Sequence, residues 1–256
     1  MNPHQTWFDL FPAWHHLQDF AAHYLERKSA FIVFDATHFT HAHVAGVELV
    51  VAALTVAAIR YRGAIAGGGD HRIVPPRGLG VRNLLEMFTD AVMNMMSGVM
   101  GEKHARRFLP LVGSLAFFIF LSNLLGLIPG FLPPTDTLKT NVALAVCVFV
   151  MTHVYGVAAH GPAYFKHFLG PVWYLAPLLL PIEIISHIAR PVSLSLRLLG
   201  NVAADHKVVT AFFVMVPLLV PLPFMLLGVI VAIVQTLVFS LLTTVYISMA
   251  VAEEEH

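Results

Sequence analysis

Residues 172–215 read VWYLAPLLLPIEIISHIARPVSLSLRLLGNVAADHKVVTAFFVM, an apolar run that is too long for an upright membrane span. An α-helix rises roughly 1.5 Å per residue, so about 40 helical residues extend ~60 Å, about twice the thickness of the hydrocarbon layer of a bilayer. Such a helix must tilt steeply, bend or break. Pro177, Pro181 and Pro191 each remove a backbone donor and are the expected bending points.

The composition of the whole chain indicates an integral membrane protein. Of 256 residues, 57% are hydrophobic and 12% are charged, whereas about 25% of the residues of an average soluble chain are charged. The formal net charge is zero, which gives no bulk polarity that favours nucleic acid or an acidic substrate. The single cysteine excludes an internal disulfide framework. The N-terminus lacks the layout of a secretory signal peptide, so we expect it to remain in the mature protein.

Four further apolar runs accompany this stretch, at about 44–60, 108–128, 141–160 and 222–250. A membrane span needs roughly 20 mostly apolar residues, so we expect an all-α integral membrane protein with about five membrane-embedded helices. Residues 108–160 are predicted to form a helical hairpin. The last run is also long for an upright span, and residues 172–250 are therefore predicted to form a long, strongly tilted antiparallel helix pair.

Basic residues in short loops predict the orientation, because they favour the cytoplasmic side. They cluster between the first and second runs: Arg60, Arg62, Arg72, Arg77, Arg82, Lys103, Arg106 and Arg107. Residues 63–106 are thus expected to form a cytoplasmic connector. Its polar residues recur at helical spacing, which predicts an interfacial amphipathic helix. Segment 1–43 would then lie outside and the C-terminus in the cytoplasm, with residues 1–256 forming a single membrane domain.

Polar residues of the long stretch recur on one helical face. Spacings of three, four, three, four and four place six of them in one stripe: Glu183, Ser186, Arg190, Ser193, Arg197 and Asn201. One arginine at a membrane centre costs about 2.5–3.5 kcal/mol on insertion scales, so the stripe is expected to face protein or water. Because its guanidinium does not deprotonate, Arg197 would act in an ion path as a fixed positive charge. The structural alternative is that Arg197 snorkels to a headgroup or pairs with Glu183 or Asp205.

Three motifs resemble subunit a of rotary ATP synthases: RPVSLSLRLLGN at 190–201, FLSNLLGLIPG at 120–130 and TLVFSLLTTVYISMAVAEEEH at 236–256. The resemblance covers residues 40 to 256. It implies a stator subunit, non-catalytic by itself, that translocates protons for ATP synthesis by providing two offset half-channels to a rotating c-ring. It also implies c-ring subunits, the peripheral stalk subunit b, other ATP synthase subunits and membrane lipid as partners. No cofactor, metal or nucleic acid is implied.

By the same resemblance, Arg197 matches the essential arginine that faces the c-ring carboxylate, prevents leakage and promotes deprotonation. Five matched polar positions line or support the half-channels: Asn201 and Asn123 near the inlet, Glu183 and Ser186 near a half-channel taken as the exit, and Gln235 beside the arginine. His206 matches an ionisable position, but the position usually paired with it is Gly228. The inlet is therefore expected to depend on His206, Asp205 and Glu183, or on water admitted beside Gly228. On an ideal helix His206 lies about 180° from Arg197 and would face an adjacent span.

Fifteen histidines allow other interpretations. One cluster could bind a metal, line a wet surface or collect protons near an outer channel mouth, and it consists of His38, His41 and His43. A second set is spaced by seven and could ligate haem, although Gly161 and Pro162 interrupt that helix; it consists of His153, His160 and His167.

An autonomous secondary transporter is the second functional class. No repeated halves are visible, and the chain offers no convincing carboxylate of its own opposite Arg197. The methionines of the interfacial helix are expected either to pack against lipid and the chain or to dock a stalk partner: Met87, Met93, Met95, Met96 and Met100. We expect a multi-pass protein of the bacterial inner (plasma) membrane. The choice between proton and sodium stays open at this point.

Overall fold

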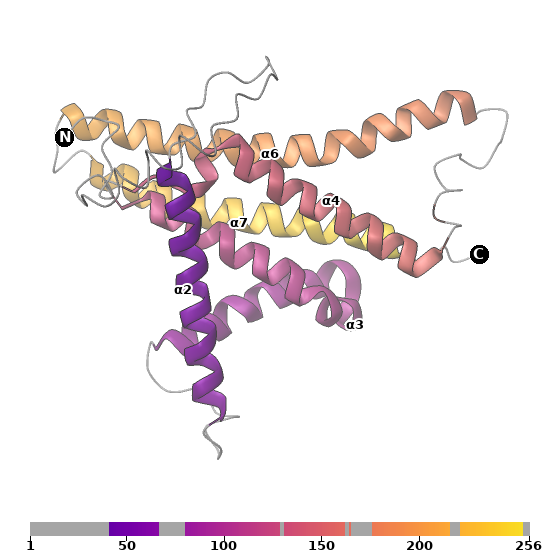
Figure 1. Ribbon diagram of the computed structural model, residues 1–256, viewed down its shortest axis with the longest axis horizontal. Helices are drawn as coiled ribbons and strands as arrows, with labels where there is room; N and C mark the ends of the chain where they lie inside the picture. Colours follow the sequence, from indigo (N-terminus) through magenta and orange to yellow (C-terminus); the bar gives the residue numbers. More distant parts are fainter. Residues whose placement is uncertain are drawn as a thin grey trace.

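The computed structural model describes residues 41–66, 80–128, 131–161, 164, 176–215 and 221–252. These residues contain no strand and form five long helices, α2 (His41–Ala66), α3 (Val81–Gly126), α4 (Leu138–His160), α6 (Ala176–Met215) and α7 (Pro221–Val251) (Figure 1). A short 3-10 helix, η3 (Pro134–Asp136), precedes α4. All five long helices are long and apolar enough to cross a membrane. The predicted all-α integral membrane fold is confirmed.

Helix α3 unites two elements that the sequence suggests as separate, the interfacial helix and the second apolar run. Its backbone leaves the helical region at Gly101, with φ 77° and ψ 158°. Positive φ is accessible to glycine at little cost because glycine has no Cβ. Figure 1 shows that α3 bends sharply and turns back on itself. We call residues 81–100 the N-terminal limb and residues 102–126 the C-terminal limb of α3.

The predicted tilted pair corresponds to α6 and α7, which are 40 and 31 residues long. Pro181 and Pro191 lie inside α6, and the helix continues through both. Pro177 falls in the first turn, where a missing backbone donor costs little. The two helices contact one another, and Figure 1 shows them running across the direction of α2. A steeply tilted helix pair would cross the direction of a neighbouring upright span in this way.

Two clusters of buried side chains hold the helices together. The first cluster lies between the C-terminal limb of α3, α4, α6 and α7, and contains Leu115, Ile119, Ala145, Val148, Leu194, Leu198, Val202 and Phe239. The second cluster joins both limbs of α3 to α7, and contains Val92, Met96, Ala105, Phe108, Val112, Ala116 and Ile247. In α6 the buried residues of the first cluster are four apart, so they form one stripe along the helix. The opposite face of α6 stays uncovered.

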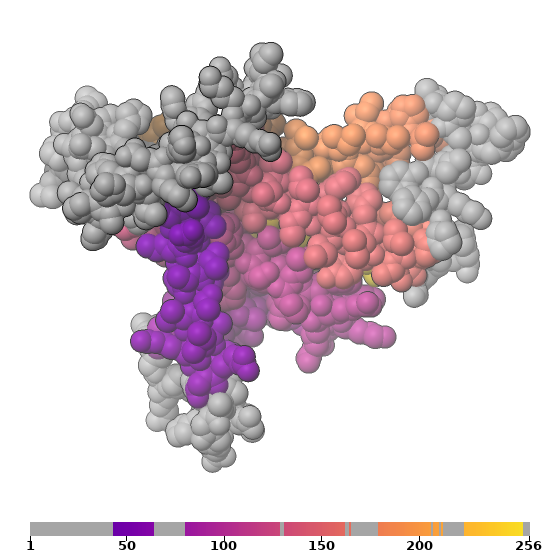
Figure 2. Space-filling model, viewed as in Figure 1, coloured from indigo at the N-terminus to yellow at the C-terminus, as the bar shows by residue number. Residues whose placement is uncertain are grey.

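Helix α2 is largely exposed. In Figure 2 much of α2 stands clear of the other helices. Its exposed side chains include Val51, Val56 and Ile59, and Ile59 is 64% exposed. Exposed aliphatic side chains of this kind suit contact with lipid, which is as apolar as they are.

Candidate functional site

Arg197 lies on the uncovered face of α6. Its neighbours Leu194 and Leu198 are 2% and 0% exposed and belong to the first buried cluster, whereas Leu196 is 52% exposed. The Arg197 side chain is itself exposed. Within the part of the chain that the structure describes, no side chain or backbone group forms a hydrogen bond or ion pair with its guanidinium. A permanent cation therefore projects from the uncovered face of α6.

The polar stripe predicted from the spacing follows this face. Four members are exposed and two are half-buried: Ser186, Ser193, Arg197 and Asn201 are exposed, and Glu183 and Arg190 are half-buried. The ion pair that the structural alternative requires is not found among the described side chains. Oε1 of Glu183 lies 3.4 Å from Nδ1 of His187, and the Asp205 carboxylate lies against Gly228 of α7.

One hydrogen bond connects the two long helices near the arginine. Nδ2 of Asn201, one turn after Arg197, donates to Oε1 of Gln235 in α7 at 2.6 Å. Gln235 is only 3% exposed. A buried amide acceptor costs free energy unless it is paired, so this bond fixes the register of α6 against α7. The structure thus brings together Asn201 and Gln235, two residues that the family resemblance places near the arginine.

Asp205 meets α7 at the glycine that departs from the expected pattern. A Cβ atom added to Gly228 would lie 2.7 Å from Oδ2 of Asp205 and would also collide with Cδ2 of Leu127. The space beside Gly228 is thus occupied by a carboxylate of α6 and a leucine that follows α3. The backbone of His206 continues α6, and its side chain lies outside the described residues.

Asn123 lies in a buried polar cluster at the end of α3. Thr135 of η3 donates its hydroxyl to Oδ1 of Asn123 at 2.7 Å, and Nδ2 of Asn141 in α4 donates to the backbone oxygen of Thr135 at 2.8 Å. These hydrogen bonds tie the segment between α3 and α4 over the end of α3. Gly126 permits the same fold-back, because a Cβ atom there would lie 2.7 Å from Cβ of Pro133. Asn123 therefore has a positioning role in the described structure.

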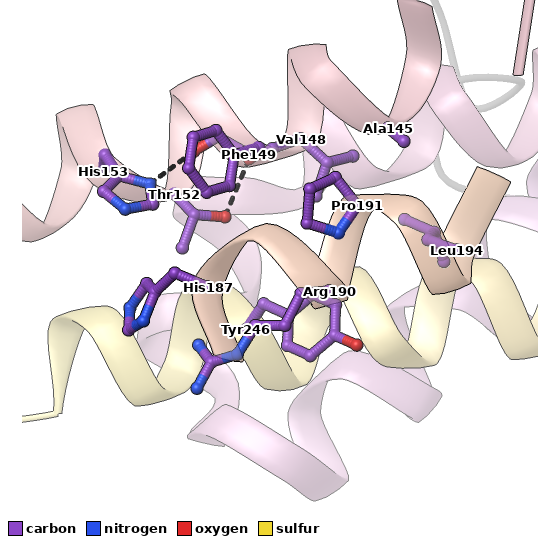
Figure 3. A pocket seen from close by; sticks show the side chains of 10 residues that line it. All are labelled: Ala145, Val148, Phe149, Thr152, His153, His187, Arg190, Pro191, Leu194 and Tyr246. Atoms are coloured by element: carbon purple, nitrogen blue, oxygen red, sulfur yellow. Dashed lines mark hydrogen bonds between the residues drawn. The ribbon is translucent and has the colours of Figure 1, made fainter. Parts of the chain in front are cut away.

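A second group of polar side chains lines a hollow between α4, α6 and α7 (Figure 3). The hollow has a cavity volume of about 20 Å³, which is room for about one water molecule, and its polar lining includes Thr152, His153, His187, Arg190 and Tyr246. The ring centroids of His153 and His187 are 5.5 Å apart. The sequence indicates His153 only as a candidate haem ligand and does not single out His187, because nothing in their spacing reveals that α4 and α6 bring them together.

The metal and haem interpretations of the histidines find no support in the described residues. No group of three or more possible metal ligands occurs among them. His38 and His167 lie outside the described residues, as does the side chain of His41. The rings nearest His153 include His187 rather than His160.

The methionines of the N-terminal limb differ in burial. Met96 is fully buried in the second cluster, and Met93, Met95 and Met100 pack at its edge. Met87 is 60% exposed. The limb therefore buries one face against the rest of the chain and presents another outward.

Comparison with known proteins places this geometry in a family. Residues 47–248 match the family described as ATP synthase A chain. The chain belongs to this family. Among relatives, it is 55% identical over 177 residues to ATP synthase subunit a 1 of Syntrophotalea carbinolica, covering 69% of this chain and 75% of that protein. It is 51% and 49% identical to ATP synthase subunit a of Trichlorobacter lovleyi and of Geobacter sulfurreducens, covering 69% of this chain and 76% of each relative.

Membership of the ATP synthase A chain family confirms the resemblance inferred from the three motifs. The matched range includes most of α2, all of α3, α4 and α6, and nearly all of α7. Arg197, Asn201 and Gln235 all lie inside it. The chain is accordingly a multi-pass membrane protein of the membrane sector of ATP synthases.

Proposed function

We propose that the chain is the proton-translocating stator subunit of an ATP synthase and that it presents Arg197 to a rotating c-ring between two offset half-channels. The observation that carries this proposal is the exposure of Arg197 on α6 without a partner among the described side chains. A charge at this depth is costly unless protein or water receives it. The exposed Val192 and Leu196 around it suit a protein contact.

Arg197 acts as an electrostatic barrier. Its guanidinium stays protonated, so it cannot pass a proton through itself. Beside a ring carboxylate it favours the ionised form, which drives release of the proton that the ring carries. Each elementary charge that crosses 100 mV supplies about 2.3 kcal/mol, so a ring must collect several protons for each ATP. A direct leak past the arginine would dissipate that energy.

Asp205 is the acidic group that we assign to the outer half-channel. Its carboxylate reaches Gly228 on α7, at a position where α7 has no side chain of its own. This contact favours Asp205 over water admitted beside Gly228, because Asp205 and Leu127 occupy that space. Asn201 and Gln235 continue the polar path toward Arg197. His206 and Asn123 stand at the borders of this region, the latter through its bond to Thr135.

The cytoplasmic half-channel leaves Arg197 in the other direction along the stripe. Ser186 is exposed and Glu183 is half-buried on the same face of α6. Glu183 lies 14 residues before Arg197, or ~20 Å along the helix axis. A carboxylate at this distance accepts protons that have already passed the barrier.

We infer the partner subunits from two exposed surfaces of the chain. The face of α6 around Arg197 contacts the c-ring, and the N-terminal limb of α3 with Met87 contacts the peripheral stalk subunit b. Other ATP synthase subunits complete the assembly, and the catalysis of ATP formation belongs to them. The location is the bacterial inner membrane, with the N-terminus outside and the C-terminus in the cytoplasm.

The experiment compares Arg197→Ala and Arg197→Lys with the wild type in membrane vesicles that contain the assembled complex. Proton-driven ATP synthesis and passive proton leak are both measured. We expect synthesis to collapse in both variants and the leak to rise with alanine. Arg106→Ala is the matched control, because Arg106 is an exposed residue of α3 whose ion pair with Glu102 contributes little. Normal synthesis by both Arg197 variants would sink the proposal.

A further inference from the structure

The hollow between α4, α6 and α7 contains titratable groups for which the proposed path has no use. The T-shaped contact of His153 and His187 brings one imidazole from each of two helices to the same end of the hollow (Figure 3). From there the lining continues along α6 past Arg190 and Pro191 to Leu194. Leu194 is three residues, less than one turn, before Arg197. Ionisable side chains inside membrane spans are costly and commonly belong to ion or proton pathways.

The hydrogen bonds of both rings determine which nitrogen exchanges protons. Nδ1 of His153 lies 2.7 Å from the backbone oxygen of Phe149, and Nδ1 of His187 lies 3.0 Å from the backbone oxygen of Glu183. A carbonyl oxygen only accepts, so each Nδ1 must carry the proton in the neutral ring. Protons therefore bind to and leave each ring at Nε2. In both rings, a backbone oxygen of the same helix binds Nδ1 and leaves Nε2 as the nitrogen that exchanges protons.

Three further side chains lie around the pair. Oε1 of Glu183 lies 3.4 Å from Nδ1 of His187. Arg190, whose guanidinium lies 5.4 Å from the centroid of the Tyr246 ring, lines the same hollow. Tyr164 completes the surroundings with its ring centroid 5.9 Å from that of His153. Burial raises the pKa of the Tyr164 phenol, so the phenol stays neutral.

We propose that His153 and His187 form a proton-relay pair in the cytoplasmic half-channel. This inference rests on the proposed function and adds two residues from different helices to its exit path. A proton released near Arg197 travels through water to Nε2 of one imidazole and forms an imidazolium. The imidazolium then gives the proton from Nε2 to the second imidazole or to cytoplasmic water, and the neutral ring is restored. No electron transfer and no covalent intermediate are involved.

The position of the pair along α6 agrees with this role. His187 lies ten residues before Arg197, which corresponds to ~15 Å along the helix. It lies between the arginine and the end of α6 that the sequence predicts to be cytoplasmic, one turn after Glu183. A relay here shortens the distance that a proton must cover between Arg197 and bulk water.

The test uses the assembled complex in inverted vesicles, in which the cytoplasmic face is turned outward and its pH is set directly. His187→Gln, His153→Gln and the double variant remove the titrating nitrogen and keep a polar side chain. His160→Gln is the matched control, since His160 lies on α4 seven residues after His153 and does not line the hollow. ATP-driven proton pumping and the amount of assembled complex are measured across about pH 5 to 8, the range in which imidazoles titrate.

We expect each single variant to lower pumping by about 10-fold or more per assembled complex, as loss of a general acid or base does. The double variant should be little worse than either single variant, because the rings act as a unit. The decisive signature is that the variants lose the imidazole transition in the dependence of pumping on cytoplasmic pH. Rates within twofold of His160→Gln, or a decrease that is equal at every pH, would overturn the relay.

The outcome for Arg197 separates this inference from the proposed function. Loss of synthesis in Arg197→Ala together with normal pumping in both histidine variants would leave the stator function intact and remove the relay. Normal synthesis in Arg197→Ala would remove both, because the relay has no proton to receive without the barrier.

Discussion

Arg190 and Arg197 are two arginines of one helix, seven residues apart on the same stripe, and their surroundings differ. The Arg190 guanidinium stacks on the Tyr246 ring of α7 and lines a hollow that α4 also borders. The Arg197 guanidinium projects from an exposed face and has no partner among the described side chains. The described part of the chain supplies the environment of the first charge, and in the proposed function the c-ring supplies that of the second.

The position of the partner distinguishes the two charges. The partner of Arg190 lies within the chain, which is typical of a structural charge, whereas the partner that we propose for the functional charge of Arg197 lies in another subunit. A cation on an aromatic ring within the chain contributes about 0.5–2 kcal/mol to stability. The second cation has no partner among the described side chains that would stabilise it within the fold, and in the proposed function it acts on a ring carboxylate. Substitution of Arg190 should therefore mainly affect the yield of assembled complex, whereas substitution of Arg197 should mainly affect ATP synthesis.

The largest effect is expected from neutralising the two arginines in parallel. Arg197→Gln should lower proton-driven ATP synthesis about 100- to 1,000-fold, because loss of one partner of a charge pair in a membrane costs about 3–5 kcal/mol. Arg190→Gln should lower synthesis less than about 10-fold and mainly reduce the yield of assembled complex. Both are measured in vesicles, normalised to assembled complex. Equal losses of ATP synthesis in Arg197→Gln and Arg190→Gln would contradict the distinction between a functional and a structural arginine.

A second large effect is expected where Asp205 meets Gly228. Gly228→Ala places a Cβ atom 2.7 Å from Oδ2 of Asp205, so the helices must separate or the carboxylate must move. We expect synthesis to fall about 10-fold, in line with the sensitivity of positioned groups to small displacements. The matched control is Gly98→Ala, since a Cβ atom at Gly98 meets nothing within 4 Å. Wild-type synthesis in Gly228→Ala would contradict the assignment of Asp205.

An intermediate effect is expected at the hydrogen bond between α6 and α7. Asn201→Ala leaves the buried Oε1 of Gln235 without its donor, which costs about 1–3 kcal/mol. The melting temperature of the purified protein should fall by roughly 2–10 °C. Removing both partners in Asn201→Ala with Gln235→Leu should cost less than the sum of the single changes. Strict additivity would show that the bond makes no contribution of its own.

The smallest effect is expected far from the arginines, at the turn between α3 and α4. Thr135→Val removes the hydroxyl that donates to Asn123 and leaves the shape of the side chain nearly unchanged. We expect a loss of about 1 kcal/mol in stability, seen as a shift of a few degrees in melting temperature. ATP synthesis per assembled complex should stay at the wild-type level. A strong loss of synthesis would mean that Asn123 is part of the proton path and not only a positioning residue.

Most of the fold could be predicted from the sequence, because hydrophobic length is a strong signal in a membrane protein. The five long helices fall where the apolar runs predict them. The break at Gly101 was less accessible, since a single glycine among polar and apolar residues does not reveal a left-handed backbone. The unbroken course of α6 through Pro181 and Pro191 could not be predicted either, because proline marks a possible kink and not its size.

The sequence predicted which residues of the candidate site share one face of α6, but not which side chains of different helices meet. Spacing alone placed Ser186, Ser193, Arg197 and Asn201 on one face of α6, and the structure leaves all four exposed. Contacts between helices depend on crossing geometry that periodicity does not encode. The His153 and His187 pair and the approach of Asp205 to Gly228 therefore came only from the structure.

The second buried cluster has a mechanical consequence for the proposed function. A stator that faces a rotor would be pushed sideways at each step, and α6 and α7 would have to pass this load to the rest of the chain. Ile247 near the end of α7 packs with Val92 and Met96 of the N-terminal limb of α3. The packing of these side chains would then determine how stiffly the α6 and α7 pair is held against that limb.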